Sequence, residues 1–389
     1  MSRITKYILL FLLGLLLGLF YLVSFQPQLI GLAKRHSLNS GLIGSTGEMD
    51  VEISTPTPTP SPPTLTLLFA GDLMLDRHVR SRANETGFDA LLGESLRQLL
   101  LKQDLVIVNL EGPITQSPSV SVGSEPGSTN NYIFTFDPHV TDFLSKYQMR
   151  LVSLGNNHIT NFGIDGVIST LNYLYQAKIE HFGWVAQSHE LNEYNQEYLV
   201  ISLNDFNLGF VNFNQFSSQP FESALNAVVL MREKTDFVIV YTHWGEEYVP
   251  NPNQVIKNQA HQLIEAGADL VIGSHPHVIQ PMEEYQGKRV YYSLGNFIFD
   301  QYFSPEVSLG QLVEMTLTKS LPSDSQADNQ VENYDSGSTN DTLIEPVFRE
   351  FYVKMAANQP IELVVSGGEI TSVSSEATAS TVFSSQMEN

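Results

Sequence analysis

The chain has 389 residues, 42% of them hydrophobic and 10% aromatic, which is enough for a packed core in one large domain or two ordinary ones. Its formal net charge is −22 at pH 7, and such an acidic surface repels phosphate backbones, so we expect no nucleic-acid partner. It contains no cysteine, which excludes disulfides, thiolate metal sites, cysteine nucleophiles and lipoprotein-type acylation, so that any metal must be held by Asp, Glu, Asn or His.

The chain begins with an apolar segment, residues 7–25, that carries no charge and has roughly the 20 residues needed to span a bilayer. Arg3 and Lys6 precede it, which favours a cytoplasmic N-terminus and an external remainder. We therefore expect residues 1–25 to be a single-pass anchor in a bacterial cell membrane, with the bulk of the chain extracytoplasmic. A cleaved signal peptide is the alternative, although the exit from the segment shows no small-x-small cleavage pattern.

Three further segments have the composition of linkers or tails. Residues 26–63 end in T-P-T-P-T-P-S-P-P, a Thr/Pro repeat that predicts a stiff, extended linker. Residues 321–342 are almost devoid of apolar side chains and predict a disordered insertion, and residues 374–389 predict a flexible tail. The folded domain is therefore expected over residues 64–373, interrupted by the insertion.

Within this domain, short apolar runs alternate with amphipathic segments. The apolar runs read as buried strands, and the amphipathic segments have the spacing of helices. Alternation of strand and helix predicts an α/β fold or a layered relative of it. The expected strands are 65–69, 104–108, 150–154, 236–240 and 269–272, and the clearest expected helices are 163–178 and 253–266.

Polar, metal-ligating side chains follow all five expected strands. In a sheet of this class, ligands bind beyond the carboxyl ends of the strands. Converging acids and imidazoles favour a cation between them, and two ions sharing a bridging carboxylate would neutralise the group. The side chains at these exits are Asp72, Asp76 and His78; Asn109 and Glu111; Asn156, Asn157 and His158; His243, Glu246 and Glu247; and His275 and His277.

Each exit taken alone also has an ordinary structural explanation, such as a turn or a packed core histidine. The strongest single signal is the stretch I-G-S-H-P-H-V over residues 272–278. Pro276 cannot donate a hydrogen bond to a neighbouring strand, so this stretch is expected at a strand exit and not within a central strand. The five exits together favour a metal site.

Six motifs, taken in order, resemble the bacterial capsule-synthesis family of the CapA type, which is associated with making and anchoring poly-γ-glutamate. The resemblance implies the four-layer αββα sandwich of the calcineurin-like metallophosphoesterases and an N-terminal transmembrane helix. The motifs are Phe-Ala-Gly-Asp (69–72), Asn-Leu-Glu-Gly (109–112), Leu-Gly-Asn-Asn-His (154–158), His-Trp-Gly-Glu-Glu-Tyr (243–248), Gly-Ser-His-Pro-His-Val (273–278) and Tyr-Ser-Leu-Gly-Asn-Phe (292–297).

The same resemblance implies a role for individual residues and a cofactor of two divalent metal ions, such as Mn, Fe, Zn or Mg. The implied metal ligands are Asp72 and His277 for the first ion, Glu111 as the bridge, and Asn157, His243 and His275 for the second; His158 is the implied catalytic acid or hydrogen-bond donor, and Asn109, Asn156 and Asn296 belong to the pocket.

Two positions depart from the pattern of the phosphoesterases. Met74 stands where these enzymes have a histidine, so the first metal loses a ligand unless Asp76 or His78 replaces it. Asn161 stands where an aspartate commonly follows the Asn-Asn-His motif.

We therefore expect a membrane-anchored, extracytoplasmic, metal-dependent hydrolase that acts on a phosphoester or amide-type bond during capsule or cell-wall polymer synthesis. Its expected partners are the membrane, an anionic polymer or its precursor, and other capsule-synthesis subunits. The alternatives are a non-catalytic polymer-binding or export subunit and, less favoured, a secreted phosphoesterase unrelated to capsule.

Overall fold

A computed structural model describes residues 62–184, 196–320 and 343–364 of the chain. The expected anchor (1–25), the expected linker up to residue 61, the expected insertion (321–342) and the expected tail (374–389) lie outside the described residues. Within the described ranges, no helix combines the length and the apolar character that crossing a membrane requires.

The first of two β-sheets has the strand order β14-β13-β12-β1-β2-β3-β4, and β11 pairs with β1 beside this path. The strands from β1 to β4 run parallel, whereas β12, β13 and β14 add antiparallel pairs. The strands are β1 (Thr64–Leu73), β2 (Leu105–Leu110), β3 (Leu151–Ser153), β4 (Glu180–Phe182), β11 (Asn296–Ile298), β12 (Leu309–Ser320), β13 (Leu343–Lys354) and β14 (Glu362–Val364).

The second sheet has the order β5-β6-β7-β8-β10-β9. Its four central strands are parallel, and β5 and β9 close the two edges in antiparallel fashion. The strands are β5 (Tyr198–Leu203), β6 (Phe206–Asn214), β7 (Phe237–His243), β8 (Leu270–Ser274), β9 (Met282–Tyr285) and β10 (Lys288–Tyr291).

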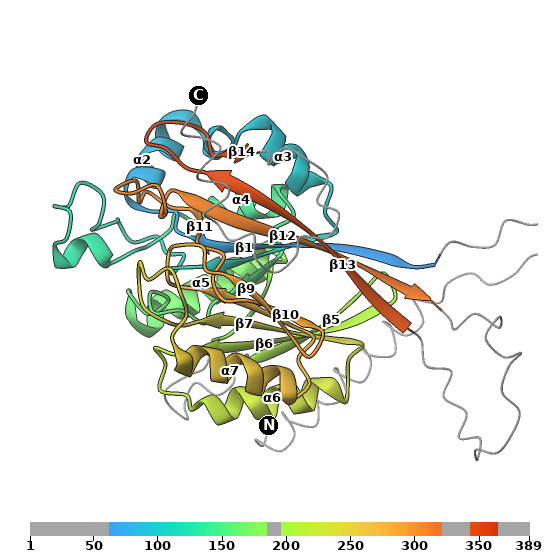
Figure 1. Cartoon of the computed structure of the whole chain (residues 1–389). Coiled ribbons are helices and arrows are strands. Elements are labelled where there is room, and N and C mark those ends of the chain that lie inside the picture. Colours follow the sequence, from blue (N-terminus) through green and yellow to red (C-terminus); the bar gives the residue numbers. More distant parts are fainter. Residues whose placement is uncertain (1–61, 185–195, 321–342, 365–389) are drawn as a thin grey trace, which may run out of the picture. The chain divides into compact units, whose positions relative to one another are not determined.

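Helices cover the outer face of each sheet, and the two sheets face each other (Figure 1). One apolar cluster lies between the sheets and joins residues such as Phe69 and Ile107 to Phe210 and Ile239. Two more clusters lie between each sheet and its helices. The first sheet is covered by α2 (Arg77–Thr86), α3 (Glu94–Leu101), α4 (Val140–Lys146) and α5 (Gly163–Ala177), with 3₁₀ turns η1 (Phe88–Leu91) and η2 (Thr129–Tyr132); the second is covered by α6 (Phe221–Arg232) and α7 (Gln254–Glu265).

The observed fold is thus a mixed α/β structure with two sheets, as expected. All five predicted strands and both predicted helices are present, with boundaries shifted by a few residues. Strands β2 and β7 are buried along their whole length, which explains why their sequences are continuous apolar runs and do not alternate.

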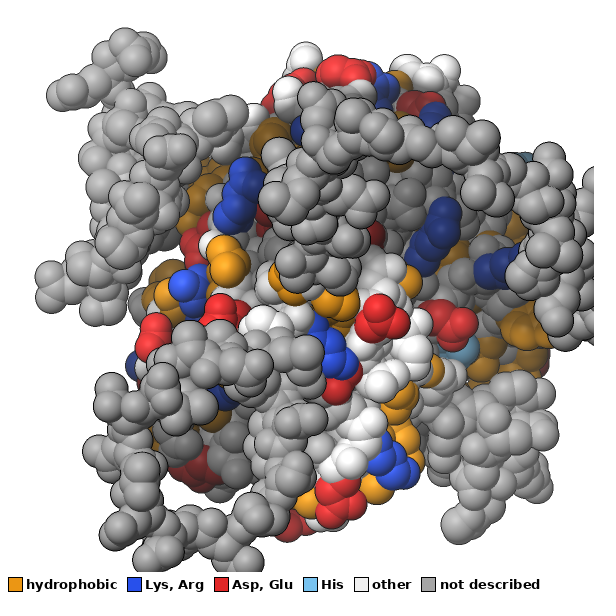
Figure 2. Space-filling view, turned by 90° about the vertical axis from the view of Figure 1, so that its right-hand side faces the viewer, with side chains coloured by type: hydrophobic (Ala, Val, Ile, Leu, Met, Phe, Trp, Pro, Cys, Tyr) orange, Lys and Arg blue, Asp and Glu red, His pale blue; other side chains and the backbone are white. Residues whose placement is uncertain are grey.

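At the end of the domain opposite the carboxyl end of β1, β12 ends and β13 begins. This side of the molecule faces the viewer in Figure 2 and carries acidic, basic and hydrophobic side chains interspersed. No broad basic patch is visible on the described part of this face.

Two glycines let the backbone approach closely at the strand ends. A Cβ atom on Gly71 would lie 1.9 Å from the carbonyl oxygen of Gly295, and one on Gly273 would lie 2.0 Å from that of Tyr292. These contacts hold the loop before β11 against β1 and the end of β10 against β8. Since Asp72 follows the first glycine directly, the close approach fixes its position.

We predict that Gly71→Ala lowers the free energy of unfolding by about 3 kcal/mol or more, because the methyl group would overlap a backbone carbonyl that cannot rotate away. Gly87→Ala is the control: its Cβ would meet open space, and only the backbone conformation, with φ 83° and ψ 154°, costs about 1–3 kcal/mol. Urea unfolding of both variants measures the difference. Equal destabilisation by the two substitutions would contradict the close-approach explanation.

Candidate metal centre

The carboxyl ends of parallel strands from both sheets meet at one site. In the first sheet the register places Asp72 on β1 opposite Asn109 on β2 and opposite Asn296 on β11. In the second sheet it places His243 on β7 opposite Ser274 on β8. The parallel register therefore brings together residues that are up to 224 positions apart in the sequence, from Asp72 to Asn296.

Glu111 lies at the centre of this site, just beyond the end of β2. It is fully buried, and neither carboxylate oxygen has a hydrogen-bond partner among the described residues. Its Oε1 lies 4.0, 3.9 and 3.8 Å from the Nε2 atoms of His158, His243 and His277. These distances are too long for hydrogen bonds.

The same distances suit a bound cation. Bonds from a metal such as zinc to imidazole nitrogen and carboxylate oxygen are each about 2.1 Å, so two ligands of one ion can lie up to about 4.2 Å apart. A buried carboxylate without a partner is costly, and a cation removes that cost. The donor set around Glu111 therefore fits a divalent metal ion in both distance and chemistry.

Asp72 and His277 supply a second part of the site. Asp72 Oδ1 accepts a hydrogen bond from Asn109 Nδ2 (2.8 Å), and its Oδ2 accepts one from the backbone N–H of His275 (3.2 Å). His277 Nδ1 lies 3.1 Å from Asp72 Oδ2 and 2.9 Å from Asn296 Oδ1. With two acceptors facing Nδ1, the proton resides there and Nε2 is left free to bind a metal.

Two groups of side chains have the compactness of metal ligands. One ligand atom from each of Asp72, Glu111 and His277 lies within 4.8 Å of the others, and the same holds for Glu247, His275 and His277. His277 is common to both groups. His275 Nδ1 is buried and lacks a hydrogen-bond partner among the described residues, as expected of a ligand atom without its ion.

Glu247 was named at its strand exit in the sequence, but no role as a metal ligand was predicted for it. It is exposed on the loop after β7, whereas the other members of the two groups are buried. The signal was present in the His-Trp-Gly-Glu-Glu-Tyr motif, whose two adjacent acids follow the strand exit. Nothing in that order of residues shows that the loop turns the second acid toward His275 and His277.

Asn157 and His243 form a close pair beside Glu111. Asn157 Oδ1 lies 2.9 Å from His243 Nε2. Neighbouring ligands of one octahedral ion lie about 3 Å apart when each bond is about 2.1 Å long. The pair can therefore either share a hydrogen bond or bind the same metal ion.

Asn109 and Asn156 hold the site together without facing it as ligands. Asn156 Nδ2 donates to Asn109 Oδ1 (3.0 Å) and to the carbonyl of Leu110 (2.8 Å). Asn156 Oδ1 accepts hydrogen bonds from the backbone N–H groups of His158 (3.1 Å) and Ile159 (2.9 Å). This asparagine thus ties the exit of β3 to the exit of β2.

His158 is oriented by the asparagine that departs from the phosphoesterase pattern. Its Nδ1 lies 3.1 Å from Asn161 Oδ1, an oxygen that also accepts the backbone N–H of Phe134 (2.8 Å). The Phe134 ring packs against the imidazole with the centroids 4.4 Å apart. Nδ1 is therefore a donor, and the lone pair of Nε2 points toward Glu111.

The loop that carries the two histidines of the His-Pro-His motif has an unusual backbone. His275 has φ 96° and His277 has φ 57°, in a region that residues with a side chain seldom adopt. Such conformations cost about 1–3 kcal/mol each and cluster at functional sites. The strain turns both imidazoles toward the acids of the neighbouring strands.

The residues proposed to replace the missing histidine lie elsewhere. Asp76 is buried, and its Oδ2 accepts the backbone N–H of Thr135 (2.8 Å). The side chain of His78 is 85% exposed and lies 3.5 Å from Asp300. Neither belongs to the two candidate ligand groups. Met74 is buried and its sulfur contacts the backbone N–H of Asp76, so no described residue takes the histidine's place.

The pKa values of Glu111 and His277, the pair at the centre of the site, are both raised. Burial and the neighbouring Asp72 raise the pKa of Glu111 well above its usual value, although His277 opposes this. Burial lowers the pKa of His277, but the charge of Glu111 and the contact with Asp72 outweigh it and raise the pKa to about 9. Without a metal, Glu111 and His277 therefore share at least one proton at neutral pH.

The other three imidazoles are neutral at pH 7. Burial lowers the pKa of His158 to about 4 and that of His275 to about 3, and it also holds the pKa of His243 well below its usual value. Neighbouring imidazoles add to each shift. Since a neutral imidazole is the form that binds metals, these three side chains are already in the protonation state that a metal ion requires.

The chain belongs to the family described as bacterial capsule synthesis protein PGA_cap, whose model matches residues 66–301. It is 25% identical to the PGA biosynthesis protein CapA of Bacillus subtilis over 251 residues, which are 61% of this chain and 64% of that protein. It is 27% identical to the capsule biosynthesis protein CapA of Bacillus anthracis over 274 residues, 67% of this chain and 66% of that one. The chain thus spans slightly less than two thirds of each relative.

Among solved structures, the fold is similar to that of a putative 5′-nucleotidase from Staphylococcus aureus. The likeness covers 80% of this chain and 56% of that one, with 14% sequence identity and a TM-score of 0.41. Membership of the capsule-synthesis family, expected from the six motifs, is confirmed.

We predict that Glu111→Gln removes most of the bound divalent metal, because the amide is a much weaker ligand than the carboxylate and cannot bridge two ions. In the metal-free protein the same substitution should lower the pKa of His277 from about 9, because the charge of Glu111 is the main influence that raises it. Elemental analysis after dialysis against Mn²⁺ or Zn²⁺ measures the first effect, and NMR titration of the histidine ring protons in chelator measures the second.

Glu314→Gln is the matched control for this prediction. Glu314 is also buried, but it accepts a hydrogen bond from Gln103 and pairs with Arg349, away from the strand exits. The control should keep its metal and leave the pKa of His277 unchanged. Equal metal contents in the two variants would contradict the assignment of Glu111 as a ligand.

Proposed function

We propose that this protein is a membrane-anchored, extracytoplasmic, metallophosphatase-like hydrolase that serves the synthesis of capsule, poly-γ-glutamate or a related cell-wall polymer. The observation that carries the proposal is the buried Glu111, whose oxygens face three imidazoles and have no hydrogen-bond partner. Family membership and the names of its two CapA relatives support the link to capsule synthesis.

The chemistry proposed for this site is metal-assisted hydrolysis of a phosphoester or amide-type bond. Divalent ions held there would supply Lewis-acid activation of water and of the oxygen of the scissile group. Asp72, Asn157 and the histidines would hold the ions. Glu247, the exposed member of the second candidate group, would be the ligand that solvent reaches. Two ions bridged by Glu111 are also the arrangement implied by the resemblance of the six motifs to the capsule-synthesis family.

The proposed location follows from the sequence outside the described residues. The apolar segment 7–25 would anchor the protein, and the Thr/Pro-rich linker would hold the domain away from the membrane surface. The proposed partners are an anionic polymer or its precursor and other subunits of capsule synthesis.

A second candidate function is a non-catalytic subunit that binds the polymer for export or anchoring. Two observations favour it: Met74 supplies no ligand to the first metal, and Asn161 leaves His158 without a carboxylate partner. The hydrogen bond to the Asn161 amide oxygen raises the pKa of His158, but burial outweighs it and holds that pKa at about 4. A carboxylate would favour the imidazolium more strongly and so make His158 a proton donor closer to neutral pH. His158 thus presents a lone pair, which suits a ligand or a proton acceptor.

Turnover separates the two candidates. We predict that the full-length protein hydrolyses phosphodiester or γ-glutamyl substrates, and that His243→Ala and His275→Ala each reduce turnover by about a hundredfold or more because a metal ligand is lost. His261→Ala is the control, since this histidine stacks on Tyr285 at a centroid distance of 3.7 Å outside the site. Bound metal without turnover that depends on His243 and His275 would favour the binding subunit.

The role of Asn161 has a test of its own. We predict that Asn161→Asp raises the pKa of His158 from about 4 by about 1–3 units, because the new carboxylate stabilises the imidazolium. NMR titration of the histidine ring protons measures the shift in the metal-free protein. Titration of His158 at an unchanged pH would show that Asn161 does not contact the ring as described.

A further inference from the structure

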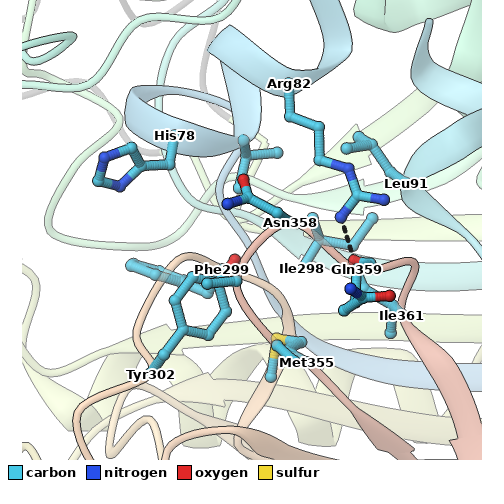
Figure 3. A pocket seen from close by; sticks show the side chains of 13 residues that line it. His78, Arg82, Leu91, Ile298, Phe299, Tyr302, Met355, Asn358, Gln359 and Ile361 are labelled. Atoms are coloured by element: carbon cyan, nitrogen blue, oxygen red, sulfur yellow. Dashed lines mark hydrogen bonds between the residues drawn. The ribbon is translucent and has the colours of Figure 1, made fainter. Parts of the chain in front are cut away.

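A cavity of about 160 Å³ lies next to the metal centre, between α2 and the segment that follows β13 (Figure 3). Its walls include His78, Arg82, Leu91, Phe299, Tyr302 and Met355. The volume corresponds to the share of liquid taken by about five water molecules, which is room for a short aliphatic group and a polar end.

Arg82 is the basic side chain of the cavity wall. Its guanidinium donates hydrogen bonds to the backbone carbonyls of Gln359 and Ala90, the latter at 3.0 Å, and Figure 3 marks the bond to Gln359. Within the described residues, no carboxylate oxygen lies within 4.0 Å of it. A guanidinium has five N–H donors and two of them are used for these carbonyls, so Arg82 keeps three donors and its positive charge for a ligand.

The nearby basic residues do not share this property. Arg77 pairs with Asp300, and Arg80 lies 3.6 Å from Asp137. His78 at the mouth of the cavity also faces Asp300. Among these residues, only Arg82 has a positive charge without a neighbouring carboxylate. This charge lies at the cavity, where its attraction for an anion is less screened than on an open surface.

Most of the remaining cavity wall is apolar, although Asn358 and Gln359 also line it. The buried side chains of Leu91 and Met355 and the rings of Phe299 and Tyr302 belong to the apolar part. An apolar wall with one convergent cation suits a ligand that has methylene groups and a terminal carboxylate. A phosphate alone would leave the apolar wall without a contact.

The cavity and the metal centre share a wall. The Phe299 ring lines the cavity, and its centroid lies 4.9 Å from that of His277. Ile298, the last residue of β11, also lines it, and this strand pairs with β1 next to Asp72. A group held in the cavity is thus one side chain away from the ligands of the metal.

We propose that this cavity is a subsite that holds one acidic unit of the substrate polymer, with the carboxylate on Arg82 and the methylene groups against Leu91, Phe299 and Met355. The proposal rests on the proposed function, because it assumes that the substrate of the metal centre is an anionic chain. It adds the position and the chemistry by which the protein recognises that chain. Binding at the subsite needs no metal and no turnover.

The test uses glutarate as the probe and glutaramide as its uncharged counterpart. The full-length protein is treated with chelator, so that no carboxylate can bind a metal, and each probe is titrated by calorimetry or NMR. We expect glutarate to bind at least about tenfold more tightly than glutaramide, as expected for a hydrogen bond to a charged group. Equal affinity for the two probes would overturn the proposal.

Two variants locate the bound probe. Arg82→Gln removes the cation, and Ala357→Trp fills the cavity from its exposed rim while leaving Arg82 in place. Each should weaken glutarate binding by about tenfold or more. Arg97→Gln is the matched control, because Arg97 pairs with Glu94 on α3 and does not line the cavity. The affinity of this variant for glutarate should equal that of the wild type.

The outcomes separate this proposal from the proposed function. Glutarate binding that both cavity variants leave unchanged would overturn the subsite even if the protein binds metal and hydrolyses its substrate. Conversely, glutarate binding that depends on Arg82 and the open cavity supports the subsite even in a protein that shows no turnover.

Discussion

The site depends on one constraint: a fully buried carboxylate, Glu111, that faces three imidazoles at distances too long for hydrogen bonds. A charge in that position is unfavourable unless a cation neutralises it or a proton occupies it. The rest of the site is consistent with a cation that neutralises this charge. Asp72 and Asn296 fix the tautomer of His277, and Asn161 fixes that of His158, so that lone pairs point inward.

The fold supplies this arrangement through parallel register. Strands β1 and β2 of one sheet and β7 and β8 of the other end at the same place, and their exits carry the ligands. Close backbone approaches at Gly71 and Gly273 pack β1 and β8 against one segment, residues 292–295, next to Asp72 and His275. The strained backbone of the His-Pro-His loop contributes to the same arrangement, because it orients the two imidazoles toward acids from other strands.

Sequence reasoning found the parts of the fold that have strong periodicity. Strands β2, β7 and β8 are buried on both faces and therefore appear as unbroken apolar runs, whereas β5 and most of β13 are half exposed and gave no such signal. Most residues of the two candidate ligand groups could be named from the sequence because they directly follow predicted strands. Glu247 was named at its strand exit but given no role as a ligand, because no periodicity reveals the course of its loop. Asp76 and His78 were considered only because they lie close to Asp72 in the sequence, and neither belongs to the two groups.

The central claim is that Glu111 binds a cation, and anomalous X-ray diffraction from crystals of the full-length protein grown with Mn²⁺ or Zn²⁺ tests it most directly. The account predicts an anomalous peak about 2.1 Å from a carboxylate oxygen of Glu111 and from at least one of the Nε2 atoms of His243 and His277. It would be contradicted by a difference map without any peak at this position and with Glu111 hydrogen-bonded to an imidazole.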